Sequence, residues 1–90
     1  MKLETLSLYV LKTLALAQFQ GRFATLDTVT REVGARRTDV RRVVSALHRA
    51  GYVDALRMRL TLAGFAAGAA LRSAPLPPLR AARMSSVVAA

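Results

Sequence analysis

Cysteine is absent from this 90-residue chain, and acidic residues and histidine are scarce. Without Cys there can be no disulfide, no thiolate metal site, no redox pair and no catalytic thiol. Five acidic residues and one His leave almost no material for metal ligation or acid–base chemistry. We therefore expect that the protein is not an enzyme and that it uses no metal and no cofactor.

Long uncharged runs are also missing. The stretch from Leu60 to Leu71 is uncharged but has only 12 residues, whereas a helix that spans a bilayer needs about 20. The first 20 residues superficially resemble a signal peptide, but Glu4 spoils its basic region and Lys12 splits its apolar run. The sequence predicts a soluble, cytoplasmic protein without a membrane partner.

Positive charge is the feature that the chain has in excess. Fourteen Lys and Arg residues give a formal net charge of +9, and twelve of the fourteen are Arg. Residues 31–59 hold eight Arg against three acidic residues, so the excess centres on the middle third. Arg suits phosphates and guanine edges because its planar guanidinium can donate two parallel hydrogen bonds. This distribution favours a polyanionic partner, either nucleic acid or an anionic membrane.

The spacing of apolar residues predicts a mainly α fold with a small β-hairpin. Helices are expected at about 3–19, 25–33 and 37–50, strands at 52–55 and 56–62, and a fourth helix at about 61–72. Thr25 and Thr61 are the expected N-caps of the second and fourth helices. The first helix is apolar over more than half its girth, so it should lie against two neighbours or against another subunit.

The hairpin is predicted from strict alternation of apolar and polar residues. The apolar set should face one way and the polar set the other, with a very tight turn near residues 54–56. The alternating residues are Leu56, Met58, Leu60 and Leu62 on one face, and Arg57, Arg59 and Thr61 on the other.

Small and aromatic residues support two further expectations. Gly64 and Gly68, one turn apart, permit close helix approach, although simple Ala-rich packing is the explanation that we favour at this stage. The five aromatic residues fit the core of the domain, so no exposed aromatics are expected to stack on single-stranded nucleic acid. Those residues are Tyr9, Phe19, Phe23, Tyr52 and Phe65.

One segment carries a resemblance to a known fold. The run TLDTVTREVGARRTDVRRVVSALHRAGYV, followed by RLTLAG, resembles the winged helix-turn-helix of bacterial transcriptional regulators. The RLTLAG run is similar to the end of the wing in the multiple-antibiotic-resistance regulator family. The opening helix is similar to that of the iron–sulfur-responsive repressor family, whose cluster-ligand role cannot be carried over without Cys. The resemblance implies a helix-helix-helix-hairpin-helix domain over residues 1–73 and a Pro-containing basic tail over 74–90, either a short helix or flexible.

The chain departs from that pattern in two places. Arg36 stands where the helix that reads DNA usually opens with Ser, so the hydroxyl cap is lost or moves to Thr38. Only eight residues separate Gly51 from Leu60, and so short a wing cannot reach far into a minor groove.

The candidate DNA-binding residues follow from the same layout. The first turns of a helix placed in the major groove meet the base edges, whereas later turns and the hairpin meet phosphates. The threonines that open the second helix offer a further phosphate site. In order of the chain, the candidates are Thr25, Thr28, Arg36, Arg37, Thr38, Arg41, Arg42, Ser45, Arg49, Arg57 and Arg59.

We therefore expect a small transcriptional regulator that binds double-stranded DNA sequence-specifically as a homodimer through its first and fourth helices. A protein–protein interaction or dimerisation module, with the Arg face solvated or meeting an acidic partner, is the alternative. A lipid-surface binder is disfavoured because the Arg face and the exposed apolar face do not share a helix. No small-molecule effector can be inferred.

Overall fold

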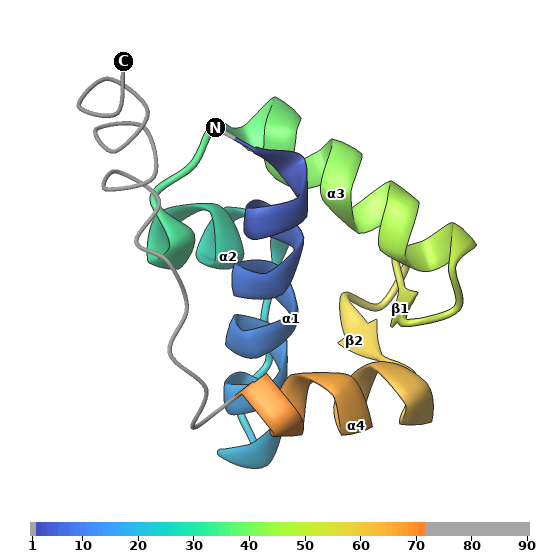
Figure 1. Ribbon diagram of the computed structural model, residues 1–90. Helices are drawn as coiled ribbons and strands as arrows, with labels where there is room; N and C mark the ends of the chain where they lie inside the picture. The colour runs from blue at the N-terminus through green and yellow to red at the C-terminus, as the bar shows by residue number, and fades with distance from the viewer. Residues whose placement is uncertain (1, 72–90) are drawn as a thin grey trace, which may run out of the picture.

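Four helices and one hairpin make up the part of the chain that the computed structural model describes, residues 2–71 (Figure 1). The elements are α1 (Leu3–Phe19), α2 (Leu26–Val33), α3 (Arg37–Arg49), β1 (Val53–Asp54), β2 (Arg59–Leu60) and α4 (Leu62–Leu71). The two strands pair antiparallel, with Val53 opposite Leu60 and Asp54 opposite Arg59. The predicted mainly helical chain with a small hairpin is confirmed. The predicted tail at 74–90 lies outside the described residues.

Helix α1 is the centre of the fold (Figure 1). It packs against α2, α3, α4 and β2. Neighbours within the same chain therefore bury the apolar side chains around most of its circumference. This confirms the expectation that the helix lies against at least two neighbours. The buried residues of α1 are Leu6, Val10, Leu11, Leu14, Ala15 and Ala17.

The rest of the core is aliphatic. It comes from α2, α3 and the hairpin, and comprises Val29, Val40, Val43, Val44, Leu47, Val53 and Leu60. The assignment of the aromatics to the core is wrong in three cases. Phe19, Phe23 and Tyr52 are 61%, 90% and 38% exposed, because short aliphatic side chains already fill this small interior.

The expected caps of α2 and α4 are confirmed. Thr25 Oγ1 accepts a hydrogen bond from the Thr28 amide (3.1 Å), and Thr61 Oγ1 accepts one from the Gly64 amide (3.1 Å). Gly34 ends α2 in the left-handed conformation, with φ at 75°. Arg36 occupies the N-cap of α3 without a side-chain cap, so the hydroxyl cap is lost there.

The hairpin differs from its prediction. Its turn spans residues 55–58 instead of 54–56, and β2 has only two residues. Leu56 (96% exposed) and Leu62 (87% exposed) do not share the buried face of Leu60. Two local contacts explain the difference. The Asp54 carboxylate accepts a hydrogen bond from the Leu56 amide, which begins a turn. Thr61 caps α4, so Leu62 is the first residue of that helix and not part of β2.

Helix α4 approaches its neighbours closely through two glycines. A Cβ on Gly68 would lie 2.6 Å from Ala15 Cβ and 2.9 Å from the Leu11 carbonyl oxygen. A Cβ on Gly64 would lie 1.8 Å from the Tyr52 carbonyl oxygen. Close approach is therefore the reason for both glycines, and the explanation by simple Ala-rich packing is wrong at these positions.

Candidate nucleic-acid interface

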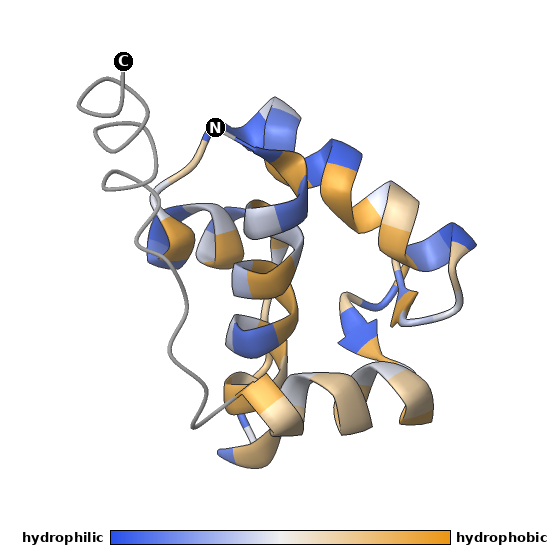
Figure 2. Ribbon diagram, in the orientation of Figure 1, coloured by the Kyte–Doolittle hydropathy of each residue, from blue (hydrophilic) through white to orange (hydrophobic). Residues whose placement is uncertain are grey.

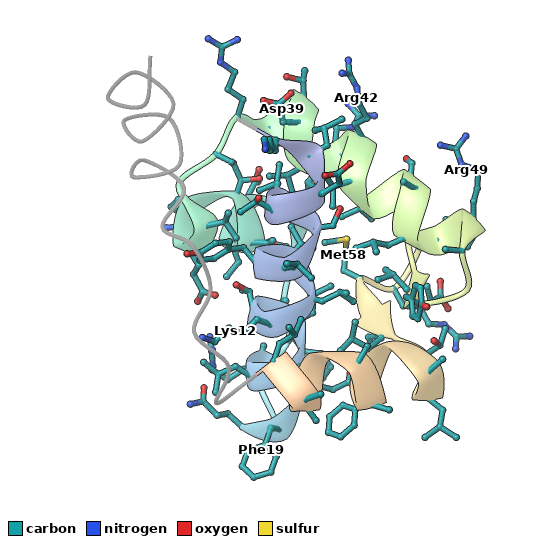
Figure 3. The ribbon with its side chains drawn as sticks, in the orientation of Figure 1. Lys12, Phe19, Asp39, Arg42, Arg49 and Met58 are labelled. Atoms are coloured by element: carbon teal, nitrogen blue, oxygen red, sulfur yellow. The ribbon has the colours of Figure 1, made fainter. Side chains whose placement is uncertain are left out.

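Helix α3 presents a polar face opposite its buried valines. We call it the α3 outer face; its exposed members are Thr38, Arg42, Ser45 and Arg49, with Arg41 at the edge. From Thr38 to Arg49 the face runs for about 16 Å at 1.5 Å per residue. Figure 3 shows Arg42 and Arg49 pointing away from α1, into solvent. The face is thus a row of long cationic side chains separated by small hydroxyls.

The arginines of this face lack acidic partners. Three ion pairs are found within residues 2–71, and none of them involves Arg41, Arg42 or Arg49. Acidic side chains elsewhere in the described part of the chain therefore leave the guanidinium charges of the face unneutralised. An external anion can approach them without displacing an internal carboxylate.

Arg36 and Arg37 are placed differently from the row. Arg37 pairs with Asp27 in the first turn of α2, and both side chains are more than half exposed. This pair joins the starts of α2 and α3, so the guanidinium of Arg37 is already partly satisfied. Arg36 is exposed at the N-cap of α3, beside the unsatisfied amides of its first turn.

The two threonines that open α2 bond each other. Their hydroxyls lie 2.9 Å apart, in addition to the capping bond from the Thr28 amide. Their role within the chain is to begin α2. A phosphate at Thr25 or Thr28 would have to share these hydroxyls with the cap.

His48 ties the hairpin to the end of α3. Its Nδ1 lies 3.0 Å from the Val53 carbonyl oxygen and 3.2 Å from the Ala55 amide nitrogen. When Nδ1 carries no proton, it accepts a hydrogen bond from the Ala55 amide; when it carries a proton, it donates one to the Val53 carbonyl oxygen. Each tautomer of the ring therefore makes one of these two bonds. His48 is exposed, and sequence reasoning missed this positioning role.

Gln18 and Thr61 hold the hairpin from the other side. Gln18 Oε1 accepts from the Leu60 amide (3.0 Å), which connects α1 to β2 across 42 positions. The Thr61 hydroxyl donates to the Gly51 carbonyl oxygen (2.6 Å). A lone Gln on an apolar helix was the only signal for the first contact, and sequence analysis did not identify it.

Two surface clefts flank the hairpin turn. The first, the α3-side cleft of about 270 Å³, is lined by Leu26, Arg41, Val44, Ser45, Ala55 and Met58. It brings the edge of the α3 outer face, the start of α2 and the turn together. The second, the α1-side cleft of about 160 Å³, lies between the turn and the end of α1. Met58 lines both, so the turn separates them.

The candidate arginines of the hairpin line the α1-side cleft. Arg57 and Arg59 border it together with Arg22. Arg57 Nε lies 3.8 Å from Asp54 Oδ2, with 79% of its side chain exposed, whereas no described carboxylate pairs with Arg59. The structure therefore divides the predicted basic residues into an α3 group and a hairpin group, one on either side of the turn.

Residues 2–71 contain no group of three or more potential metal ligands. None of the described helices is both long enough and apolar enough to cross a membrane. Comparisons of the chain with protein-family models, curated proteins and solved structures find no match. The geometry of α3 and the hairpin is thus the basis for a functional proposal.

Proposed function

We propose that the protein is a winged helix-turn-helix transcriptional regulator that binds double-stranded DNA sequence-specifically. The observation that carries the proposal is the α3 outer face, with three exposed arginines that form no ion pair with any carboxylate of residues 2–71. The hairpin supports it, because His48 fixes it beside α3 at the place where a wing would lie.

The shape of α3 suits a major groove. That groove is about 12 Å wide and admits an α-helix together with its side chains. α3 projects its outer face from one side of the fold, with no other described element in front of Arg42 and Arg49 (Figure 3). Phosphates would border the helix on both sides, where the surrounding arginines lie.

The residues of the site take separate roles under this proposal. Arg41 and Arg42, in the first half of α3, are the candidates for guanine contacts, because a bidentate guanidinium matches guanine O6 and N7. Thr38 and Ser45 can bond a base or a phosphate. Arg49, Arg57 and Arg59 are assigned to phosphates, which fix position without reading sequence. Arg37 contributes less to DNA binding under this proposal, because it already forms an ion pair with Asp27.

We further propose that the protein acts as a homodimer. Helix α4 holds no charged residue, and no part of it is coloured hydrophilic in Figure 2. Its exposed residues are Leu62 (87% exposed), Ala63, Ala66, Ala69 and Ala70. Leu16 and Phe19, at the end of α1, add exposed apolar surface. Two copies joined there could present two α3 helices to successive major grooves, about 34 Å apart, of a palindromic site.

Selection from a random pool of duplex DNA tests the proposal. We expect the full chain to enrich one motif, with two inverted half-sites if the homodimer binds. Recovery of unselected random sequence would contradict sequence-specific binding.

The alternative is a protein–protein interaction module, favoured by the exposed Phe23 and Leu62. Electrophoretic binding to random duplex DNA at moderate salt separates the two functions, because such a module would leave the duplex free. The exposed aromatic side chains could instead stack on the bases of single-stranded nucleic acid. Competition between the duplex and a single strand of the same sequence tests this, because preference for the single strand would contradict recognition of duplex DNA.

A further inference from the structure

Leu56, at the tip of the hairpin turn, is the most exposed large apolar side chain in residues 2–71, at 96%. The neighbouring turn residues Ala55 and Met58 pack against the core, whereas Leu56 and Arg57 project from it. The core does not bury Leu56, and the α4 surface proposed for the dimer does not include it.

The turn that carries Leu56 is held in place by side chains of the fold. Asp54 Oδ1 accepts from the Leu56 amide (3.1 Å), and His48 Nδ1 lies 3.2 Å from the Ala55 amide. Met58 closes the turn in the left-handed conformation, with φ at 51°. Because the backbone of the turn is held this way, binding of a partner orders less of the chain, which favours binding.

The charge around the tip indicates what that partner is. Arg57 is adjacent and largely exposed, Arg59 follows on β2, and Arg41 lines the α3-side cleft next to Ala55. One carboxylate, that of Asp54, belongs to the turn, and it is engaged by the Leu56 amide and Arg57. An apolar tip bordered by guanidinium groups complements a groove with phosphate walls and stacked bases at its floor.

We propose that Leu56 is a minor-groove wedge that enters beside the major groove occupied by α3, opens one base step and bends the duplex. This inference rests on the proposed function. Apolar side chains of this kind unstack a step and bend DNA by about 20° or more. Because the hairpin is too short to reach deep into an undeformed minor groove, the wedge requires that the bend open this groove toward the tip. The opened step should be a pyrimidine–purine step, since these unstack most easily.

The test uses the full chain and a duplex obtained by selection from a random pool. A 2-aminopurine placed at successive positions reports unstacking by a rise in fluorescence, and energy transfer between the duplex ends reports bending. We expect both signals with the native protein, at one step per half-site. Leu56→Ser should remove both signals and weaken binding about tenfold or more, as loss of a buried Leu side chain implies. Leu56→Met, which keeps an apolar wedge, should retain them.

Salt dependence separates the wedge from an ionic contact. Leu56→Ser should leave the slope of log K against log salt unchanged, whereas Arg57→Ala should make it shallower by about one per subunit. If the native protein binds DNA without bending it, or if Leu56→Ser bends DNA equally, the wedge proposal is wrong but the proposed DNA binding is not contradicted. A change in the sedimenting mass of Leu56→Ser would overturn it in favour of a protein contact. Absence of any duplex binding would overturn the proposed function itself.

Discussion

The arginines of α3 differ in what their guanidinium groups contact. Arg37 pairs with Asp27 on α2, whereas Arg42 projects into solvent without an acidic partner in residues 2–71 (Figure 3). Helical periodicity could place both on the exposed side of α3. It could not reveal the ion pair, because Asp27 precedes Arg37 by ten positions and comes close only through the turn between the helices.

Substitution of single arginines should distinguish base contacts from phosphate contacts. We expect Arg42→Ala to relax sequence preference by about 1–3 kcal/mol, the worth of a bidentate guanine contact. Arg59→Ala should weaken binding to all sequences about equally, because a phosphate contact carries no base information. Binding titrations of both variants with a selected and a random duplex measure this. Parallel losses on both duplexes for Arg42→Ala would show that α3 does not read bases at that residue.

At the scale of elements, the helices and the presence of a hairpin could be predicted, but the turn and the strand lengths of the hairpin could not. Helix ends depend on local signals, such as the cap at Thr25 and the left-handed Gly34, which are visible in the chain. The hairpin depends on bonds from distant side chains, above all from Gln18 to Leu60. Alternation also does not show the local bonds from Asp54 to the Leu56 amide and from Thr61 to the Gly64 amide, and so it gave a longer second strand and a turn that begins one residue too early.

The packing of α4 gives a prediction at the same scale. Gly64→Ala should lower the free energy of unfolding by about 1–3 kcal/mol, because its Cβ would collide with the Tyr52 carbonyl oxygen. Helix propensity alone predicts the opposite sign, a gain of about 1 kcal/mol. Urea unfolding measures the difference, and Ala46→Gly, at an exposed position inside α3 that no proposed contact uses, is the matched control, expected to cost about 1 kcal/mol. A more stable Gly64→Ala variant would contradict the close approach.

At the scale of the whole molecule, the proposed homodimer covers the exposed side of α4. Two copies of a 9.7 kDa chain should sediment as a species of twice that mass at micromolar concentration. Ala66→Arg should shift this species toward monomer with helicity retained, since Ala66 is exposed and can accept a long side chain. A single species of 9.7 kDa for the native protein would reject the homodimer.

The net charge of +9 leads to the measurement that bears most directly on DNA binding. Affinity for a duplex should be titrated at several salt concentrations with the full chain. With about five phosphates neutralised per subunit, among them those bound by Arg49, Arg57 and Arg59, the slope of log K against log salt should be about −4 to −5 per subunit. A slope shallower than about −1, or no duplex binding at low salt, would contradict the proposal that this protein binds DNA.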